Sequence, residues 1–206
     1  MNQILNTKLQ TNNQKNKKMF KIQFFVSSFI FLLVLVSFGW YFLSIQRKEK
    51  MSSDVIDNYN VSKLYANLSD NSAYENSINI FGIIEIPKIN IYYPIFSNLS
   101  DELLKIAPCK FYGSTLNRND NICIAGHNYN NSLFFSNIAI LNANDEIYIY
   151  DNEGKKYIYN VLKIYEVKYD NLSPIFDYDK NSKELTLVTC NNLNSNRIIL
   201  KAKQNV

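Results

Sequence analysis

The chain has 206 residues and a formal net charge of +4, and 47% of its residues are hydrophobic. This length allows one domain of ordinary size plus a tail or anchor, and the apolar fraction is sufficient for a packed core. The first 46 residues contain no acid and five lysines, which account for more than the whole net charge (Lys8, Lys15, Lys17, Lys18 and Lys21). The remainder is close to neutral. This argues against nucleic acid as a partner, because nucleic-acid-binding domains carry their basic residues on the folded part.

Residues 24–45 form a run of 22 residues without a charge. As a helix rising 1.5 Å per residue, this run is long enough to span a hydrocarbon core of about 30 Å. Trp40 and Tyr41 lie near its end, where amphipathic rings prefer the membrane interface. The run therefore predicts a transmembrane helix over residues 24–45 that contacts the lipid bilayer.

The charges on either side of this run predict its orientation. Lysines precede it, whereas basic and acidic residues are mixed after it, which favours a cytoplasmic N-terminus. We expect a basic cytoplasmic tail over residues 1–23 and everything beyond the span outside the cell, in a single-pass membrane protein. A cleaved signal peptide is the alternative, but its apolar region is 7–15 residues long and ends in a small-residue cleavage site. This run is longer and continues into WYFLSIQR.

Residues 46–78 are polar and rich in Ser, Asn and Asp, which predicts an extracytoplasmic stalk. Leu64, Tyr65 and Leu68 have the spacing of one or two amphipathic helical turns. A folded domain is expected over residues 79–206.

Short apolar runs separated by turn residues predict strands throughout this domain. Ser100, followed by two acids, is a typical N-cap of a short helix. Residues 132–141 have apolar side chains at helical spacing, and residues 151–154 (DNEG) are typical of the turn of a β-hairpin. Strands dominate, which indicates an all-β barrel or sandwich with one or two short helices. The predicted strands cover residues 81–86, 91–96, 121–126, 146–150, 156–167, 184–189 and 197–202.

Three residues with complementary chemistry lie at predicted strand ends. Cys190 ends the strand TLVTC, His127 follows the strand in IAGHN and is the single histidine, and Arg197 opens the last strand. In acyl transfer, a thiol attacks a carbonyl, an imidazole moves protons and a guanidinium stabilises the oxyanion. Taken singly, each residue is also typical of an ordinary loop or surface position, so the spacing alone does not decide between these interpretations.

The sequence segments around these residues resemble the motifs of sortases, a family of cysteine transpeptidases. LTLVTC, followed by a short loop and NRIIL, resembles the TLxTC…R signature of the family. IAGHNY resembles its histidine motif, and GIIEIPKINIYYPI resembles its opening strand pair. The resemblance covers about residues 80–203 and implies a closed β-barrel of about eight strands with one or two short helices, behind a transmembrane helix.

The resemblance also implies an activity. Cys190 would attack the peptide bond of an LPxTG-like sorting signal at the C-terminus of a secreted protein, which gives a thioacyl enzyme. An amine of a Gram-positive cell-wall precursor would then take over the acyl group and attach the protein to the wall. His127 would be the proton partner of Cys190, and Arg197 would hold the oxyanion.

Further residues are expected at the substrate by the same resemblance. Thr189, beside the nucleophile, would line the pocket, and the recognition loop between Lys168 and Lys183 would place three residues against the substrate (Pro174, Ile175 and Phe176). This loop is too short for the helical insertion of class B. A second span after Lys203 and a DPW-like lid, which would indicate class C, are not found in the sequence, so a class A or class D-like enzyme is expected.

No cofactor is expected. Cys123 alternates within an apolar strand and is interpreted as a small buried hydrophobic residue, with a Cys109–Cys123 disulfide as the alternative that an extracytoplasmic location allows. The sequence lacks the CxxC spacing of a zinc site. Five acids are interpreted as solvated turn residues, with Ca²⁺ binding, as in some sortases, as the alternative (Asp145, Asp151, Glu153, Asp177 and Asp179).

Two other functions remain open at this stage. A cysteine peptidase would hydrolyse the same thioester without transferring the acyl group. A catalytically inactive, membrane-tethered binding domain would not form the thioester at all.

Overall fold

The computed structural model describes residues 2–68, 80–129 and 132–205, and it divides the chain into two compact units, Met1–Arg47 and Lys48–Val206. Helix α1, Asn2–Leu68, contains the predicted basic tail, the predicted span and the first part of the predicted stalk. Residues 69–78 of the predicted stalk lie outside the described residues.

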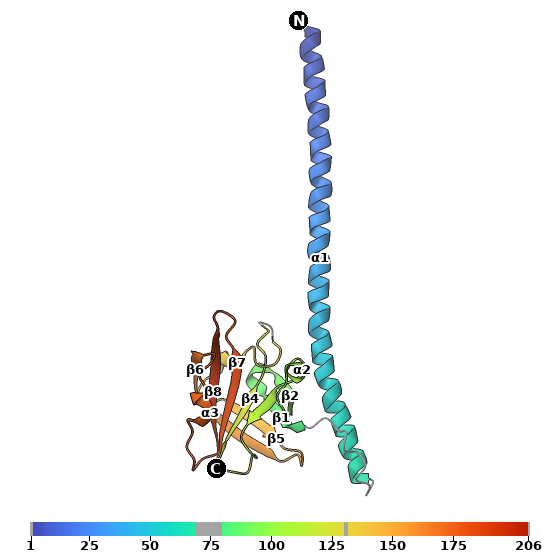
Figure 1. Ribbon diagram of the computed structural model, residues 1–206. Helices are drawn as coiled ribbons and strands as arrows, with labels where there is room; N and C mark the ends of the chain where they lie inside the picture. The colour runs from blue at the N-terminus through green and yellow to red at the C-terminus, as the bar shows by residue number, and fades with distance from the viewer. Residues whose placement is uncertain (1, 69–79, 130–131, 206) are drawn as a thin grey trace. The chain divides into compact units, whose positions relative to one another are not determined.

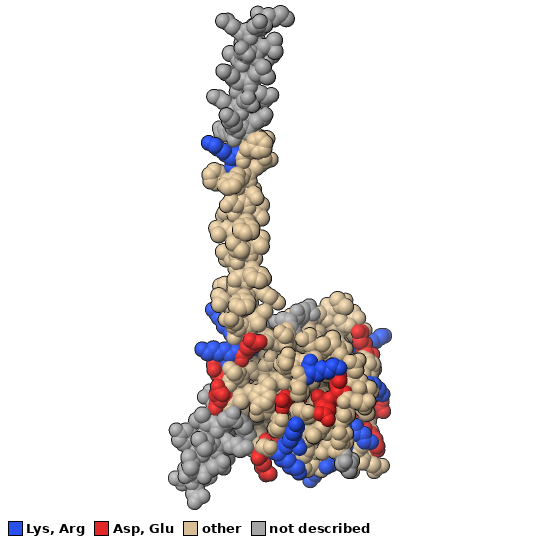
Figure 2. Space-filling model, turned by 180° about the vertical axis from the view of Figure 1, so that it is seen from behind, with Lys and Arg blue, Asp and Glu red and all other residues tan. Residues whose placement is uncertain are grey.

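Helix α1 carries the apolar run on all of its faces. The large apolar side chains from Phe24 to Leu43 are exposed, and Figure 2 shows a stretch of helix without a charged side chain. Over Met19–Asp57 the helix is long and apolar enough to cross a membrane. A helix that is hydrophobic all round needs an apolar surrounding, which a bilayer provides.

The second unit contains a closed barrel of eight strands in the order β1-β2-β3-β4-β7-β8-β6-β5 (Figure 1). The pairs β2/β3 and β4/β7 are parallel, and the other neighbours are antiparallel. The sequence-based prediction of a barrel of about eight strands is confirmed. The strands are β1 Ile80–Ile86, β2 Ile91–Phe96, β3 Cys109–Tyr112, β4 Asn121–Ala125, β5 Glu146–Tyr150, β6 Lys156–Lys168, β7 Glu184–Cys190 and β8 Asn196–Gln204.

Alternation of side chains along each strand separates the inside of the barrel from its outer face. Leu185 and Leu187 of β7 and Leu200 of β8 are fully buried in the main core cluster. Cys190 and Arg197 occupy positions of the opposite parity. The candidate chemistry therefore lies on the outer face of the strands that the core residues hold in place.

Short helical elements occupy the connections. Helix α2, Asp101–Leu104, begins after Ser100, whose side chain accepts a hydrogen bond from the Leu103 N–H, as the sequence predicts. Helix α3, Ser173–Phe176, lies between β6 and β7. Two 3₁₀ turns, η1 Pro87–Ile89 and η2 Ile138–Ile140, lie in other connections between the strands.

Two local predictions differ from the structure. Strand β3 was not predicted: it has four residues, and its parallel pairing with β2 is a single register pair. Residues 132–141 form a loop with the turn η2, although the apolar spacing suggested a helix. Phe134 has a left-handed φ of 49°, which ends any regular right-handed helix there. The residues directly before and after it are each buried in the core.

Candidate active site

Cys190 and Arg197 face each other across neighbouring strands. Cys190 is the last residue of β7, and its register partner in β8 is Arg197. Arg197 Nη1 donates a hydrogen bond to Cys190 Sγ over 2.8 Å. Directly opposed residues on one face of an antiparallel pair are close enough for their side chains to meet, so the β7–β8 register itself brings the guanidinium to the thiol.

A polar anchor holds the loop between these two residues. Asn191, Asn194 and Asn196 each donate a side-chain hydrogen bond to the Glu166 carboxylate on β6. The amides, that of Asn196 first, hold the pKa of Glu166 below its usual value. Glu166 therefore stays an acceptor near neutral pH, and the loop after Cys190 is tied to β6.

His127 follows β4, and its position is set by main-chain contacts on both sides. The Gly126 N–H donates to the Val188 carbonyl of β7 over 3.0 Å, and the His127 carbonyl accepts from the Phe135 N–H over 3.1 Å. The imidazole lies against the Tyr129 ring, with centroids 5.0 Å apart. The histidine loop is thus fixed to the strand that carries Cys190.

Asn128 connects the histidine loop to Cys190. Its Nδ2 donates to the Cys190 carbonyl over 2.9 Å, and its own carbonyl accepts from Asn192 Nδ2 over 2.9 Å. The sequence interpretation missed this residue, although it stands next to His127 in IAGHN. An Asn side chain is common in loops for many reasons, so nothing in the sequence pointed to this contact.

One cavity of about 490 Å³ brings the three predicted catalytic residues together. His127, Cys190 and Arg197 all line it. Most of the other lining residues are apolar and come from α2, α3, the residues just before these helices and the barrel strands (Leu99, Leu104, Phe111, Ala125, Leu172, Pro174, Ile175, Val188 and Ile199). A second hollow of about 360 Å³ is also lined by Cys190 and Arg197, together with Tyr169 and the β7–β8 loop.

The predicted substrate residues lie in different places. Pro174 and Ile175 line the cavity. Phe176 is not among its lining residues; its exposed ring contacts Tyr112 edge to face, with centroids 5.5 Å apart. Thr189 also lines the cavity, but it is almost fully buried, and its hydroxyl donates to the Gly126 carbonyl over 2.7 Å. Thr189 therefore holds the main chain next to His127.

Cys109 and Cys123 are buried free thiols, so the alternative of a disulfide between them is not realised. Burial raises the pKa of Cys109 to about 11 and that of Cys123 to about 12. Cys190 is half-buried. Since the thiolate is the nucleophile, the two buried thiols are poor nucleophiles at neutral pH.

Two of the acidic residues accept hydrogen bonds from neighbouring groups of the protein. Asp145 accepts hydrogen bonds from Lys88 and from the Asn142 N–H, and Asp151 accepts from two N–H groups of the β5–β6 turn. Among the residues that the structure describes, no group of three or more His, Cys, Asp or Glu side chains is placed to hold a metal ion.

The arrangement supports attack on a carbonyl. The Cys190 thiol borders the cavity, the Arg197 guanidinium adjoins the sulfur, and His127 lines the same cavity. A preorganised donor stabilises the negative charge that develops on a carbonyl oxygen under attack. An imidazole can take a proton from a thiol and deliver it to a leaving amine.

Comparisons with known proteins identify the family. A family model described as a sortase domain matches residues 84–205. Sortase A from Bacillus anthracis is 31% identical over 118 residues, which are 57% of this chain and 55% of that protein. This chain therefore matches about half the length of that curated relative.

Solved structures share the barrel. A sortase D5 transpeptidase from Clostridium perfringens superposes with a TM-score of 0.59 at 24% identity, covering 77% of this chain and 98% of that one. Sortase C from the same organism, solved with the C-terminal cell wall sorting motif, gives a TM-score of 0.56 at 24% identity and covers 76% and 90% of the two chains. At this identity the likeness shows a common fold. The family match extends over more than half of the sequence and includes the β7–β8 pair that carries Cys190 and Arg197, and the chain belongs to the sortase family.

Proposed function

We propose that this protein is a membrane-anchored cysteine transpeptidase that cleaves an LPxTG-like sorting signal and transfers the acyl group to an amine of the cell wall. The contact of 2.8 Å between Arg197 Nη1 and Cys190 Sγ, in a cavity that His127 also lines, carries this proposal. Covalent acyl transfer requires a thiol, a cationic hydrogen-bond donor and a proton carrier, and here residues of all three kinds line one cavity.

The reaction proceeds in two steps at Cys190. The sulfur forms a bond to the scissile carbonyl carbon, the peptide C–N bond breaks, and the leaving amine takes the proton that His127 received from the thiol. The incoming amine then attacks the thioester, a new C–N bond forms and the C–S bond breaks, and the proton that the amine loses passes by way of His127 to the sulfur, which restores the thiol. Arg197 donates to the oxyanion in both steps.

The cavity supports an apolar sorting signal as the acyl donor. Its floor consists of Ala125, Val188 and Ile199, and Pro174 and Ile175 form part of its wall. Such a surface suits aliphatic and proline side chains, as in LPxTG, because their burial is favourable. The second hollow shares Cys190 and Arg197 with this cavity, which supports a separate place for the accepting amine.

The proposed location follows from α1. Residues 24–45 cross the membrane, residues 1–23 lie in the cytoplasm, residues 46–78 form the extracytoplasmic stalk, and the catalytic domain, residues 79–206, acts outside the cell. The exposed apolar surface of the helix and the lysines before it support this arrangement.

The test uses the purified full chain in detergent micelles. Peptides with LPxTG-like motifs are incubated with and without a glycine oligomer or a cell-wall peptide that has a free amine, and the products are identified by mass spectrometry. We expect the N-terminal peptide fragment joined to the amine, and a thioester adduct on Cys190 when the amine is omitted. Fragments that end only in a free carboxylate would make the protein a hydrolase. Equal turnover by Cys190→Ala would contradict the thioacyl mechanism.

A further inference from the structure

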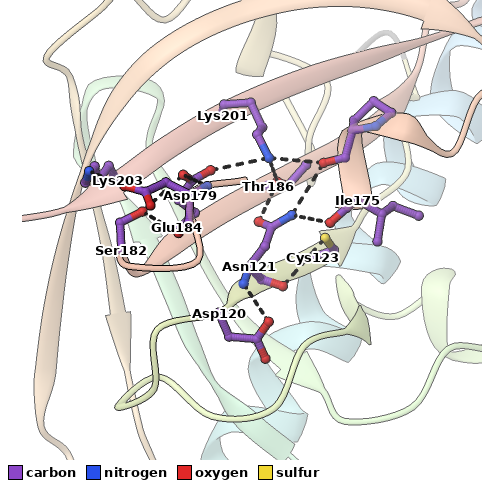
Figure 3. A network of polar contacts seen from close by, with 11 residues as sticks. Asp120, Asn121, Cys123, Ile175, Asp179, Ser182, Glu184, Thr186, Lys201 and Lys203 are labelled. Carbon is purple, nitrogen blue, oxygen red and sulfur yellow. Dashed lines mark hydrogen bonds and ion pairs between the residues drawn. The ribbon is translucent and has the colours of Figure 1, made fainter. Parts of the chain in front are cut away.

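Figure 3 shows a buried polar cluster on the barrel strands. By the alternation of side chains along β7 and β8, it lies on the same outer face as Cys190 and Arg197. We call it the lysine cluster. Its members come from three adjacent strands: Asn121 from β4, Glu184 and Thr186 from β7, and Lys201 from β8. Each is at most 6% exposed. None of them lines the cavity, so the proposed chemistry makes no direct use of them.

The strand register relates the lysine cluster to the active site. On β7 and β8, Thr186 is opposite Lys201 and Cys190 is opposite Arg197. The pair between them on the same face, Val188 and Ile199, lines the cavity. The catalytic pair and the lysine cluster therefore flank the apolar floor of the cavity along one face of the β7–β8 ladder.

The Lys201 ammonium makes three polar contacts inside the protein. Its Nζ donates to the Pro174 carbonyl over 3.0 Å and to Thr186 Oγ1 over 3.0 Å, and it lies 3.5 Å from Glu184 Oε2. Two of these contacts are hydrogen bonds, and the third is a buried ion pair. The contact with Pro174 reaches from β8 to α3.

Asn121 adds a second link from the barrel to α3. Thr186 donates to Asn121 Oδ1 over 2.7 Å, which leaves the Asn121 amide group to donate to the Ile175 carbonyl over 2.9 Å. The main chain of Pro174 and Ile175 is thus held by side chains of β4 and β8. These two residues are the part of α3 that lines the cavity together with the preceding Leu172.

Glu184 holds the other end of the same connection. Its Oε1 accepts from the Asp179 N–H over 2.9 Å and from Ser182 Oγ over 3.1 Å. Lys201 and Glu184, as a pair, therefore fix the β6–β7 connection at two points, at α3 and at the turn that enters β7 (Figure 3).

Burying such a pair is an expensive way to stabilise a fold. Removing two charges from water has a desolvation cost that their attraction often fails to recover. Apolar residues of similar volume frequently stabilise a fold as well as a buried ion pair does, or better. A buried ion pair is better explained by what it positions, and here its donors end on the main chain of the cavity wall.

We propose that Lys201, together with Glu184, Thr186 and Asn121, is a positioning residue for the acyl donor. It holds α3 so that Pro174 and Ile175 form the wall against which the sorting signal packs. This inference rests on the proposed function, because it assigns the wall to that substrate. It predicts an effect on substrate binding that exceeds the effect on the chemical step.

The test compares paired and single variants of the full chain in detergent. Lys201→Met alone leaves Glu184 buried without its cation, which can unfold the protein. Lys201→Met/Glu184→Gln removes both charges, and the glutamine oxygen still accepts from Asp179 and Ser182. We expect this double variant to fold and to show a KM for the sorting peptide about tenfold higher, the equivalent of one lost hydrogen bond, with kcat within about twofold of wild type.

Lys203→Met is the matched control. Lys203 lies two residues further along the same face of β8, and its Nζ is 3.5 Å from Asp179 Oδ2 in the same connection. Both side chains of that pair are about half exposed, at 43% and 52%. Exposed ion pairs contribute little to stability, so we expect KM and kcat to stay at their wild-type values.

Hydrogen–deuterium exchange provides a readout that needs no turnover. The amides of Ile175 and Asp177 are bonded within the turns of α3, and we expect them to exchange faster in the double variant than in wild type or in Lys203→Met. Unchanged exchange in these amides would overturn the anchoring role, whether or not any peptide is a substrate. A wild-type enzyme without transfer activity would contradict the proposed function instead.

Two kinetic outcomes would also overturn the inference. One is a wild-type KM in a folded double variant. The other is an equal loss in kcat and kcat/KM with unchanged KM, together with a lower melting temperature, which would make the lysine cluster a structural element only.

Discussion

The three thiols of this chain differ in reactivity because they differ in burial. Cys109 and Cys123 are fully buried, and desolvation raises the pKa of each, to about 11 and about 12. Cys190 is half-buried and borders two hollows. A raised pKa keeps a thiol protonated at every pH below it, and a protonated thiol is a poor nucleophile. We therefore expect Cys190 to be the one thiol of the three that reacts.

Alkylation should therefore be confined to Cys190. At pH 9, about 1% of Cys109 and about 0.1% of Cys123 are thiolate on the pKa values given above, and burial restricts access further. We expect native protein treated with iodoacetamide between pH 6 and pH 9 to gain one adduct, located on Cys190 by peptide mass spectrometry. Cys190→Ala should gain none until it is denatured, when two adducts appear. Native labelling of Cys109 or Cys123 at a comparable rate would contradict the assignment.

Arg197 is expected to act through the geometry of its guanidinium. Nη1 already donates to Cys190 Sγ over 2.8 Å, and a second nitrogen of the planar fork remains for an oxyanion. Lysine keeps a positive charge but lacks the fork. We predict that Arg197→Ala and Arg197→Lys both lower kcat/KM by about 100-fold, as loss of an oxyanion donor does, with unchanged circular dichroism. Near-normal rates in Arg197→Lys would mean that positive charge alone is sufficient.

At the level of elements, the histidine loop depends on one close contact. A Cβ atom at Gly126 would lie 2.6 Å from the ring of Phe135, which is fully buried. Gly126 itself connects to Val188 and Thr189 of β7 through main-chain and side-chain hydrogen bonds. The loop that carries His127 therefore cannot shift without disturbing the strand that carries Cys190.

This contact predicts that a side chain at Gly126 lowers both stability and activity, and that a smaller side chain at Phe135 restores part of each. Gly126→Ala should lower the free energy of unfolding by about 1–3 kcal/mol, as overpacking does, and lower kcat/KM by about 10–100-fold through displacement of His127. Gly126→Ala/Phe135→Leu makes room for the new methyl group. We expect the double variant to recover part of both losses in chemical denaturation and peptide assays, a non-additivity typical of touching residues. Strict additivity would show that the ring does not set the loop.

Local patterns were sufficient to predict most of the elements of the barrel. The hairpin of β5 and β6 follows from DNEG, in which Asp151 accepts from two N–H groups of the turn and Gly154 has a φ of 83°. The N-cap of α2 at Ser100 follows from local chemistry in the same way. Strand β3 was not predicted, because a four-residue strand next to a glycine has too few positions for an alternation of apolar and polar residues to be visible.

The candidate site was only partly predictable. Cys190, His127 and Arg197 lie in recognisable sequence motifs, and the structure places all three at one cavity. The lysine cluster was not predictable, because it depends on pairing between β4, β7 and β8. In the sequence, NRIILKAK reads as a strand with one face in solvent. Only the packing of the β6–β7 connection on that face makes Lys201 a buried residue.

The whole molecule combines a lysine-rich segment and an apolar helical segment with a nearly neutral barrel domain. A run of 22 uncharged residues corresponds to a helix of about 33 Å at 1.5 Å per residue, slightly longer than the hydrocarbon core. Lysines before the run are retained on the cytoplasmic side during insertion, whereas acids contribute little to orientation. In the proposed orientation, the barrel that contains Cys190 lies outside the cell.

The single reactive thiol makes this orientation measurable. A membrane-impermeant maleimide added to intact protoplasts should label Cys190 as completely as it does after lysis, and an N-terminal epitope tag should remain on the labelled chain, since an anchor is not cleaved. Cys190→Ala is the control for labelling elsewhere. Labelling that appears only after lysis would place the barrel in the cytoplasm, and loss of the tag would show a cleaved signal peptide. Replacing the five lysines of residues 1–23 by glutamine should reduce labelling in intact protoplasts, because the charge bias that orients the helix is then removed.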